Sequence, residues 1–312
     1  MRSRSHVEIV QISDLHVPDV AGARGALGQD SDAGLAAVLR AINDGPRPEV
    51  VIASGDLADK GTIAAYERLA DALMSLDVAV HCLAGNHDHH EPLVSTMPGA
   101  SVHVDGSAVV GDWLLVFADS NAHGRERTAD GRWSDRPDRY LAAEHGGMTP
   151  EEHDRAMAAL ASSREPHALL WVHHPPVAPD GAETDAAYGA QIRALIHSHP
   201  HVRAIACGHF HTAYDGLLDE RPVFVAPSTS INFDVRSGTY AAPGFRRLQL
   251  HDDGHVTSSV HFLDDEFPEP RTRAAPPSLI ELMLGRITLD ELRALTDEQY
   301  VERYGCPRPA RP

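Results

Sequence analysis

Cysteine is scarce in this chain, and its scarcity excludes one class of fold. The 312 residues include three cysteines, Cys82, Cys207 and Cys306, which is too sparse and too odd a set for a disulfide framework. Cys82 and Cys207 lie within apolar runs, so we expect unreactive thiols packed in a core. A small secreted domain held together by disulfides is therefore excluded.

Basic residues and long apolar runs are also scarce. Lysine and arginine number 27 against 45 aspartates and glutamates, which gives a net charge of −18. An acidic surface argues against sequence-independent binding to DNA or RNA, although bound metal ions could still supply positive charge for a small phosphate substrate.

No run approaches the roughly 18 apolar residues of a membrane span. The expected first core strand begins at Val7, which leaves nothing for a cleavable signal peptide, so we expect a cytoplasmic enzyme.

The chain does contain an alternation of expected strands and helices. In the first third these lie at 8–12 (strand), 32–42 (helix, capped by Asp32), 49–53 (strand), 62–76 (helix) and 78–83 (strand). The successive β-to-α steps predict a core of parallel strands. The rest is expected to contain strands at 102–104, 108–110, 113–118, 168–172, 202–206 and 223–226, a helix opened by Thr149 with Glu152 in a capping box, a helix at 188–197, and a hairpin of 245–250 and 255–262.

Five short polar motifs each follow one of these expected strands. They are Asp14-Leu15-His16, Gly55-Asp56-Leu57-Ala58-Asp59, Gly85-Asn86-His87-Asp88, His173-His174-Pro175-Pro176 and Gly208-His209-Phe210-His211. The carboxyl ends of core strands meet at one edge of a sheet, so these side chains are expected to converge. Carboxylate, amide and imidazole ligands together suit manganese, iron or zinc, and there are enough of them for two ions.

The spacing within the motifs adds a local expectation. In an extended segment, residues two apart point the same way, so Asp14 and His16 should face one side together, as should His209 and His211. The adjacent residues His173 and His174 cannot both do so. Only one member of that pair is expected to be a ligand.

In this order, the five motifs resemble those of the calcineurin-like metallophosphoesterases, and most of all the bacterial cyclic-nucleotide phosphodiesterase branch. Segments 226–230 and 242–246 extend the resemblance, which spans about residues 7–264. It implies an α/β fold in four layers, an αββα sandwich of two mixed β-sheets flanked by helices. The periodicity of the sequence alone would not separate this arrangement from other α/β folds.

The resemblance also implies the roles of individual residues. One metal ion is expected at Asp14, His16, Asp56 and His211, and the second at Asp56, Asn86, His173 and His209, with Asp56 bridging the two. The family places its ligand two residues before the first proline, which selects His173 and leaves His174 to face the substrate. Asn86 and His87 are also expected to contact the substrate.

The mechanism implied by the resemblance needs an activated water and a proton donor. Two metal ions could hold a hydroxide between them, which would attack phosphorus in line with the leaving oxygen. His87 would stabilise the developing charge and protonate the leaving oxygen. Asp59 resembles the carboxylate that orients this histidine, although a solvated loop carboxylate is the alternative for Asp59.

These expectations favour a phosphodiesterase acting on cyclic 3′,5′-AMP or a related nucleotide-like diester. One alternative is a phosphomonoesterase, either a nucleotidase or a biosynthetic phosphatase. Another is a non-catalytic nucleotide-binding protein, although degenerate members of the family usually lose ligands and none is missing here. A nuclease is disfavoured by the negative charge.

Two segments stand apart from the expected catalytic domain at 1–265. The arginine-rich insertion at 121–147 could be a lid or a specificity cap, with Trp133 and Tyr140 stacking on a base, or it could be a solvated loop. The tail at 266–312 is expected to form helices at 278–284 and 289–295. Its apolar residues suggest packing on the core or on a second copy of the chain, and we favour a homodimer.

Overall fold

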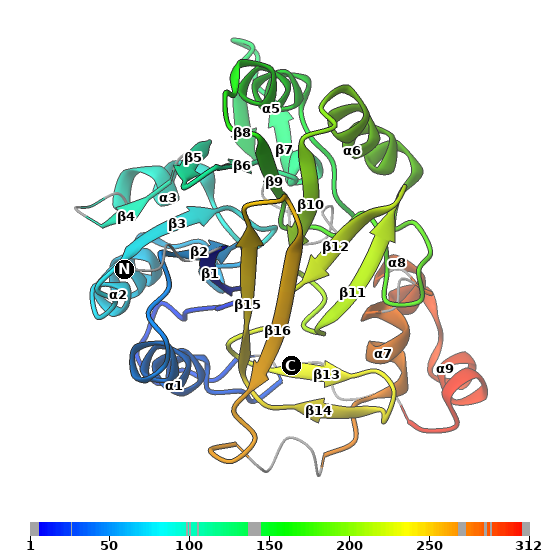
Figure 1. Ribbon diagram of the computed structural model, residues 1–312. Helices are drawn as coiled ribbons and strands as arrows, with labels where there is room; N and C mark the ends of the chain where they lie inside the picture. Colours follow the sequence, from blue (N-terminus) through cyan, green and yellow to red (C-terminus); the bar gives the residue numbers. More distant parts are fainter. Residues whose placement is uncertain are drawn as a thin grey trace.

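Two β-sheets packed face to face form the centre of the molecule, and helices cover the outer face of each sheet (Figure 1). The computed structural model describes residues 6–25, 27–97, 99, 101–104, 106–136, 145–267, 273–283, 286–287 and 289–307. The expected α/β architecture of two mixed sheets flanked by helices is therefore confirmed.

The first sheet is built mainly from the N-terminal part of the chain. Its strands are β1 (His6–Ile12), β2 (Val50–Ser54), β3 (Ala79–Leu83), β4 (Val102–His103), β15 (Gly244–His251) and β16 (Val256–Phe262). They lie in the order β16-β15-β1-β2-β3-β4. Strands β1 to β4 run parallel, whereas β15 runs antiparallel to both β1 and β16.

The second sheet repeats this plan with a later part of the chain. Its strands are β5 (Ser107–Val110), β6 (Trp113–Phe117), β9 (His167–Trp171), β10 (Val202–Cys207), β11 (Tyr214–Leu218) and β12 (Arg221–Val225). They lie in the order β11-β12-β10-β9-β6-β5, with β6, β9, β10 and β12 parallel and the edge strands antiparallel. Both sheets therefore end several parallel strands at one edge.

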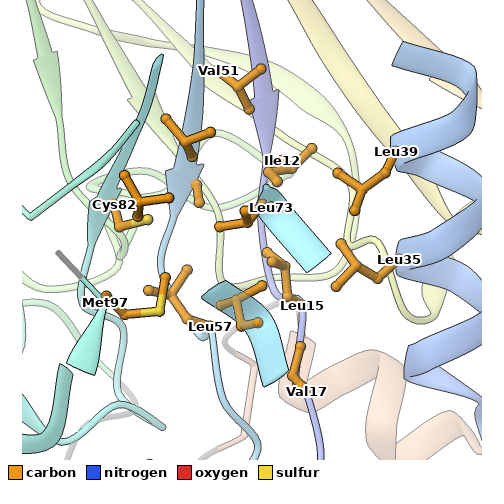
Figure 2. Packing of buried hydrophobic residues seen from close by; sticks show 14 of the residues in the cluster. Ile12, Leu15, Val17, Leu35, Leu39, Val51, Leu57, Leu73, Cys82 and Met97 are labelled. Carbon is orange, nitrogen blue, oxygen red and sulfur yellow. The ribbon is translucent and has the colours of Figure 1, made fainter. Parts of the chain in front are cut away.

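The main helices are α1 (Ser31–Asp44), α2 (Ile63–Leu73), α3 (His90–Thr96), α5 (Pro150–Ser162) and α6 (Ala186–Ser198). Helices α1, α2 and α3 bury an apolar cluster against the first sheet, in which Leu35 and Leu39 of α1 face Ile12 and Leu15 (Figure 2). Helices α5 and α6 do the same on the second sheet. A third cluster, with Trp113 among its members, fills the space between the sheets.

Two helix starts differ from those expected. Helix α1 is capped by Asp30, whose side chain accepts the main-chain N–H of Ala33, rather than by Asp32. Thr149 caps α5 as expected, but the carboxylate of Glu152 accepts the main-chain N–H of Asp119 and so does not complete a capping box. In each helix the side chain of the cap residue satisfies one of the free N–H groups of the first turn.

Smaller elements surround the two sheets. They are η1 (Ala122–Gly124), β7 (Arg125–Arg127), β8 (Trp133–Asp135), β13 (Asn232–Asp234), β14 (Thr239–Ala241), α7 (Pro277–Met283), α8 (Leu289–Ala294) and α9 (Asp297–Tyr304). The tail contains the two expected helices and, in addition, α9. The domain boundary at 265/266 stays a prediction. Residues 137–144 of the insertion, which include Tyr140, lie outside the described residues, as does Leu284 at the end of the first tail helix. None of the described helices has the length and apolar content needed to cross a bilayer.

Candidate metal centre

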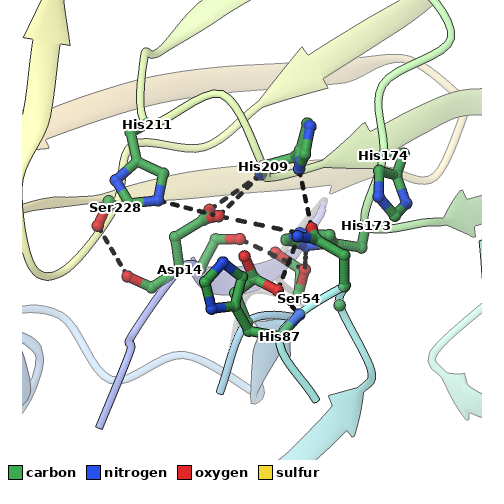
Figure 3. Close-up of polar contacts among 12 residues, drawn as sticks. Asp14, Ser54, His87, His173, His174, His209, His211 and Ser228 are labelled. Atoms are coloured by element: carbon green, nitrogen blue, oxygen red, sulfur yellow. Dashed lines mark hydrogen bonds and ion pairs between the residues drawn. The ribbon is translucent and has the colours of Figure 1, made fainter. Parts of the chain in front are cut away.

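The five polar motifs meet where the parallel strands of the two sheets end, and side chains from both sheets point toward one another there (Figure 3). The first sheet contributes Asp14 and His16 after β1, Asp56 after β2 and Asn86 after β3; the second contributes His173 after β9, and His209 and His211 after β10. The site therefore exists only where the two sheets are packed together.

One cluster joins Asp14, His16 and His211. Nε2 of His16 lies 2.9 Å from Nε2 of His211, and the latter atom lies 3.5 Å from Oδ1 of Asp14. The donor atoms of these three residues fall within 4.8 Å of one another. One carboxylate and two imidazoles at this spacing form a candidate metal-binding group.

A second cluster lies beside the first. Nδ1 of His209 is 3.1 Å from Oδ1 of Asn86, and Nε2 of His173 is 3.4 Å from Oδ1 of Asp56. The other carboxylate oxygen of Asp56, Oδ2, lies 3.7 Å from Nε2 of His16 in the first cluster. Asp56 thus directs one oxygen to each cluster, as a bridging ligand would.

His173 provides a direct test of whether a metal ion fits this site. Its ring is fully buried, and its Nδ1 lies 2.9 Å from the main-chain carbonyl of Ser54, which fixes the ring. Its Nε2 has no hydrogen-bond partner although it points at Asp56 and Asp14. A buried polar atom without a partner is costly, and a metal ion would satisfy it. The residues therefore fit the expected ions.

The backbone at these ligands is not extended, so that part of the sequence expectation was wrong. Five predicted ligands have a left-handed φ: Asp14 (51°), His16 (46°), Asp56 (49°), His209 (76°) and His211 (49°). Such a conformation costs roughly 1–3 kcal/mol for a residue other than glycine and persists only where its surroundings enforce it. Here main-chain bonds between the motifs enforce it, for example from the N–H of Asp14 to the carbonyl of Gly55 at 3.0 Å.

Two glycines allow the motifs to approach one another. A Cβ on Gly55, whose φ is 101°, would lie 2.3 Å from Nδ1 of His173. A Cβ on Gly85 would lie 2.3 Å from the main-chain nitrogen of Asp56. Any side chain at either position would displace a predicted ligand.

The two buried carboxylates of the site differ electrostatically. Burial raises the pKa of Asp14, with His211 and His173 opposing it. Burial acts the same way on Asp56, but His173 and the other neighbouring histidines outweigh it and hold the pKa of Asp56 well below its usual value. Asp56 is therefore the more firmly ionised carboxylate of the two.

The histidines also differ in protonation. Burial lowers the pKa of His16 and brings that of His209 to about 3, so both rings are neutral and offer a lone pair. Burial would lower the pKa of His173 too, but the charge of Asp56 raises it to about 9. Because only a neutral imidazole is a ligand, an ion at Nε2 of His173 would displace that proton.

His87 stands at the edge of the first cluster, with its ring edge-on to His16 at 4.6 Å between centroids. Its main-chain N–H donates to Oδ1 of Asp56 at 2.8 Å, which ties it to the predicted bridging ligand. Its Nδ1 lies 2.9 Å from the main-chain carbonyl of Asp59, whereas the carboxylate of Asp59 lies 3.9 Å from Nδ1 of His16. The main-chain carbonyl of Asp59 thus contacts His87, and the expected contact of its carboxylate with His87 stays a prediction.

Asp88 is a positioning residue to which the sequence reasoning gave no role. Its buried carboxylate accepts the main-chain N–H groups of Leu57, Ala58 and Gly85 and the hydroxyl of Tyr66. It therefore links the loop of Asp56 to the loop of Asn86. Burial and the charge of Asp56 raise its pKa to about 6. The signal in the sequence was its place directly after His87, at the end of the motif Gly85-Asn86-His87-Asp88.

His174 lies behind the second cluster. Its Nδ1 is 2.9 Å from Oγ of Ser120, and its ring centroid is 4.6 Å from that of His209. His173, His174 and His209 also bring one ring nitrogen each within 4.8 Å of one another, so they form a further group of possible metal ligands. The expected choice of His173 as ligand and of His174 as substrate-facing stays a prediction, although the partnerless Nε2 favours His173.

Comparison with known proteins adds a family match to this geometry. A family model described as calcineurin-like phosphoesterase matches residues 7–213, a span that contains every predicted ligand. A 3′,5′-cyclic adenosine monophosphate phosphodiesterase of Escherichia coli K12 is 27% identical, over 87% of this chain and 95% of its own length. Its counterpart in Pseudomonas aeruginosa is 29% identical, over 83% of this chain and 91% of its own. A 3′,5′-cyclic-nucleotide phosphodiesterase of Nostoc is 26% identical over 86% and 97%.

Solved structures show a similar fold at lower sequence identity. The purple acid phosphatase PPD1 of yellow lupin superposes with a TM-score of 0.54 at 15% identity, over 84% of this chain. The chain spans only about half of that phosphatase, 52% of its length. GAP50 of Plasmodium superposes with a TM-score of 0.52 at 10% identity, covering 83% of this chain and 85% of that protein. At these identities the likeness concerns the fold alone.

Proposed function

The chain belongs to the calcineurin-like phosphoesterase family and is a metal-dependent phosphoric ester hydrolase, and we propose that its substrate is a small phosphodiester, with cyclic 3′,5′-AMP as the leading candidate. Two observations together carry this proposal. Carboxylate, amide and imidazole groups converge from both sheets, and the buried Nε2 of His173 faces two carboxylates without a hydrogen bond. The relatives named as cyclic-nucleotide phosphodiesterases, which match along nearly their whole length, support the choice of ester.

We assign one ion to Asp14, His16, Asp56 and His211, and the second to Asp56, Asn86, His173 and His209. When bound, manganese, iron or zinc ions would supply Lewis acidity that activates water and draws charge from the phosphoryl oxygens. The ionised Asp56, directed to both clusters, would keep the two ions together.

His87 is the proposed proton donor to the leaving oxygen. Its main-chain bond to Asp56 holds it at the metal clusters, and the carbonyl of Asp59 faces Nδ1, which leaves Nε2 as the atom to deliver the proton. An imidazole is suited to this task near neutral pH. Asn86 and His174 would contact the phosphate beside it.

A substrate panel with added Mn²⁺ tests the proposal. It consists of cyclic 3′,5′-AMP, bis-p-nitrophenyl phosphate, p-nitrophenyl phosphate, glycerophosphodiesters and 5′-AMP. We expect diester turnover that Asp56→Ala abolishes, with slow monoester turnover. Fast monoester turnover with inert diesters would replace the proposal by a phosphomonoesterase with insertion 121–147 as its cap. A homodimeric state and a cytoplasmic location stay predictions.

A further inference from the structure

A pocket of about 310 Å³ lies outside the candidate metal centre, and its lining residues have no part in the reaction described so far. One wall is the start of α3, with His89 and His90, and the other is the hairpin β7–β8, with Arg125, Trp133 and Asp135. A volume of this size lies at the lower end of the range for small-molecule sites and suits a single aromatic ring system.

Both walls of this pocket are tied to the loop that carries Asn86 and His87. His89 lies two residues beyond His87, and its main-chain N–H donates to the hydroxyl of Tyr66 at 2.9 Å. At the base of the insertion, Nδ2 of Asn121 donates to the carbonyl of Gly85 at 3.3 Å. The pocket therefore adjoins the loop of the proposed proton donor, and a proton donor must stand next to the leaving oxygen.

The ring of Trp133 is held in a fixed plane. Its Nε1 donates to Oε2 of Glu151 at 3.1 Å, and the guanidinium of Arg127 lies over its ring at 5.0 Å from the centroid. Trp133 is also the accessible tryptophan of the chain, since Trp113 and Trp171 are 1% and 0% exposed. A fixed and partly exposed indole is a ready stacking surface for a flat ring.

The charges lining the pocket favour a neutral ring over a second phosphate. Among its described lining residues the one arginine, Arg125, is paired with Asp119 at 2.5 Å. The carboxylate of Asp135 accepts the main-chain N–H of His90 at 3.1 Å through Oδ2, and the same oxygen lies 3.6 Å from Nδ1 of His89. A carboxylate has several lone pairs, so its other oxygen can accept a further N–H. Burial lowers the pKa of His90, so its imidazole adds no positive charge.

We propose that this pocket seats the base of the nucleotide whose ribose carries the leaving oxygen, with the ring stacked on Trp133 and an exocyclic amino group, such as that of adenine, donating to Asp135. The inference rests on the proposed phosphodiesterase function, and it names the part of the substrate, the base, that the pocket would recognise. It also assigns a role to the insertion, as the wall that recognises the base.

Steady-state kinetics with base-bearing and base-free diesters test this assignment. We expect Trp133→Ala to raise KM for cyclic 3′,5′-AMP about tenfold or more while leaving KM for a glycerophosphodiester unchanged. Trp133→Phe keeps a flat ring and should retain most of the affinity. Arg132→Ala is the matched control, because this neighbour on the same hairpin has an 83% exposed side chain. An equal change for both substrates in Trp133→Ala would overturn the proposal.

Ligand binding followed by fluorescence separates this inference from the proposed function. Titration of the Mn²⁺-loaded protein with 5′-AMP should quench tryptophan emission, ribose 5-phosphate should not, and Trp133→Phe should remove the response. Quenching without any diester turnover would keep the base pocket and discard the phosphodiesterase. Diester turnover without quenching would discard the base pocket and keep the phosphodiesterase.

Discussion

The metal centre and the base pocket lie a few residues apart on one loop, yet they are built in opposite ways. At the metal centre the side chains of Asp14 and His173 are fully buried, and the main chain is held in left-handed conformations by bonds between the motifs. The hairpin that forms one wall of the pocket also carries half-exposed ion pairs, such as that of Arg127 with Glu151. The first arrangement holds each residue by several bonds, whereas the second leaves side chains exposed to solvent.

This difference separates the residues expected to carry out the reaction from those expected to select the substrate. A residue of the centre cannot change without disturbing a partner on the other sheet, because its conformation depends on several main-chain bonds at once. The hairpin contacts α3 and α5 through side chains such as Asp135 and Trp133 and contributes no predicted ligand, so its replacement should change what is bound and leave the reacting groups in place. Substitutions in the two regions should therefore separate metal content and turnover from substrate preference.

The largest effect is expected from Asp56→Asn. Loss of the charge shared by both clusters should remove metal and activity together, since an amide offers one oxygen in place of two. Elemental analysis of the purified protein and diester turnover measure the two losses. Asp135→Asn makes the same change in the pocket wall and should keep full metal content. Retention of both ions by Asp56→Asn would contradict its bridging role.

The next effect is expected from His87→Ala, which removes the proposed proton donor and no predicted ligand. Metal content should stay, while kcat should fall by about 10²–10⁴-fold on alkyl esters, whose leaving oxygens need protonation. The fall on p-nitrophenyl esters should be much smaller, because p-nitrophenolate leaves without a proton. Equal losses on both kinds of ester would argue against general-acid catalysis.

A stability effect is expected from Gly55→Ala. The new methyl group would meet the ring of His173 and would need a left-handed conformation, so we expect a loss of about 2–4 kcal/mol in the free energy of unfolding. Gly131→Ala on the hairpin is a matched control, since Gly131 has a φ of 82° with nothing within 4 Å of its Cβ. That variant should lose only about 1–2 kcal/mol. Denaturant unfolding measures both, and similar losses would show that crowding at His173 is unimportant.

The smallest effect is expected from Arg127→Ala. This change removes an exposed ion pair and the cation over Trp133, and exposed interactions of both kinds contribute little to stability. We expect a drop of a few degrees at most in the unfolding midpoint and a modest rise in KM for cyclic 3′,5′-AMP, with unchanged metal content. Loss of metal in this variant would show that the hairpin supports the centre after all.

The strands and the residues that follow them were predictable because the signal was local. The apolar, β-branched run that ends at Ile12 is followed at once by Asp14, and the same change of character recurs before Asp56 and Asn86. Strand β11 escaped prediction because Asp215 and Gly216 interrupt its alternation, and pairing with β12 provides what the local pattern lacks. Tertiary pairing of this kind leaves no trace in a short window.

The site contained features that no local pattern encodes. The left-handed backbone at Asp14 and His209 depends on bonds to residues far along the chain. Asp88 became informative only once its carboxylate was seen to collect N–H groups from two loops. The main-chain carbonyl of Asp59 contacts His87, and a contact made by a main-chain atom cannot be predicted from side-chain chemistry.

The division of ligands between the sheets sets an order for biosynthesis. His16 and His211 are 195 positions apart, so a ribosome must complete about two thirds of the chain before the first cluster can close. We therefore expect the nascent N-terminal half, with Asp14, His16, Asp56 and Asn86 already emerged, to hold metal poorly. Ion uptake would then be a late event in maturation, and a truncated product ending before β10 would be released without its cofactor.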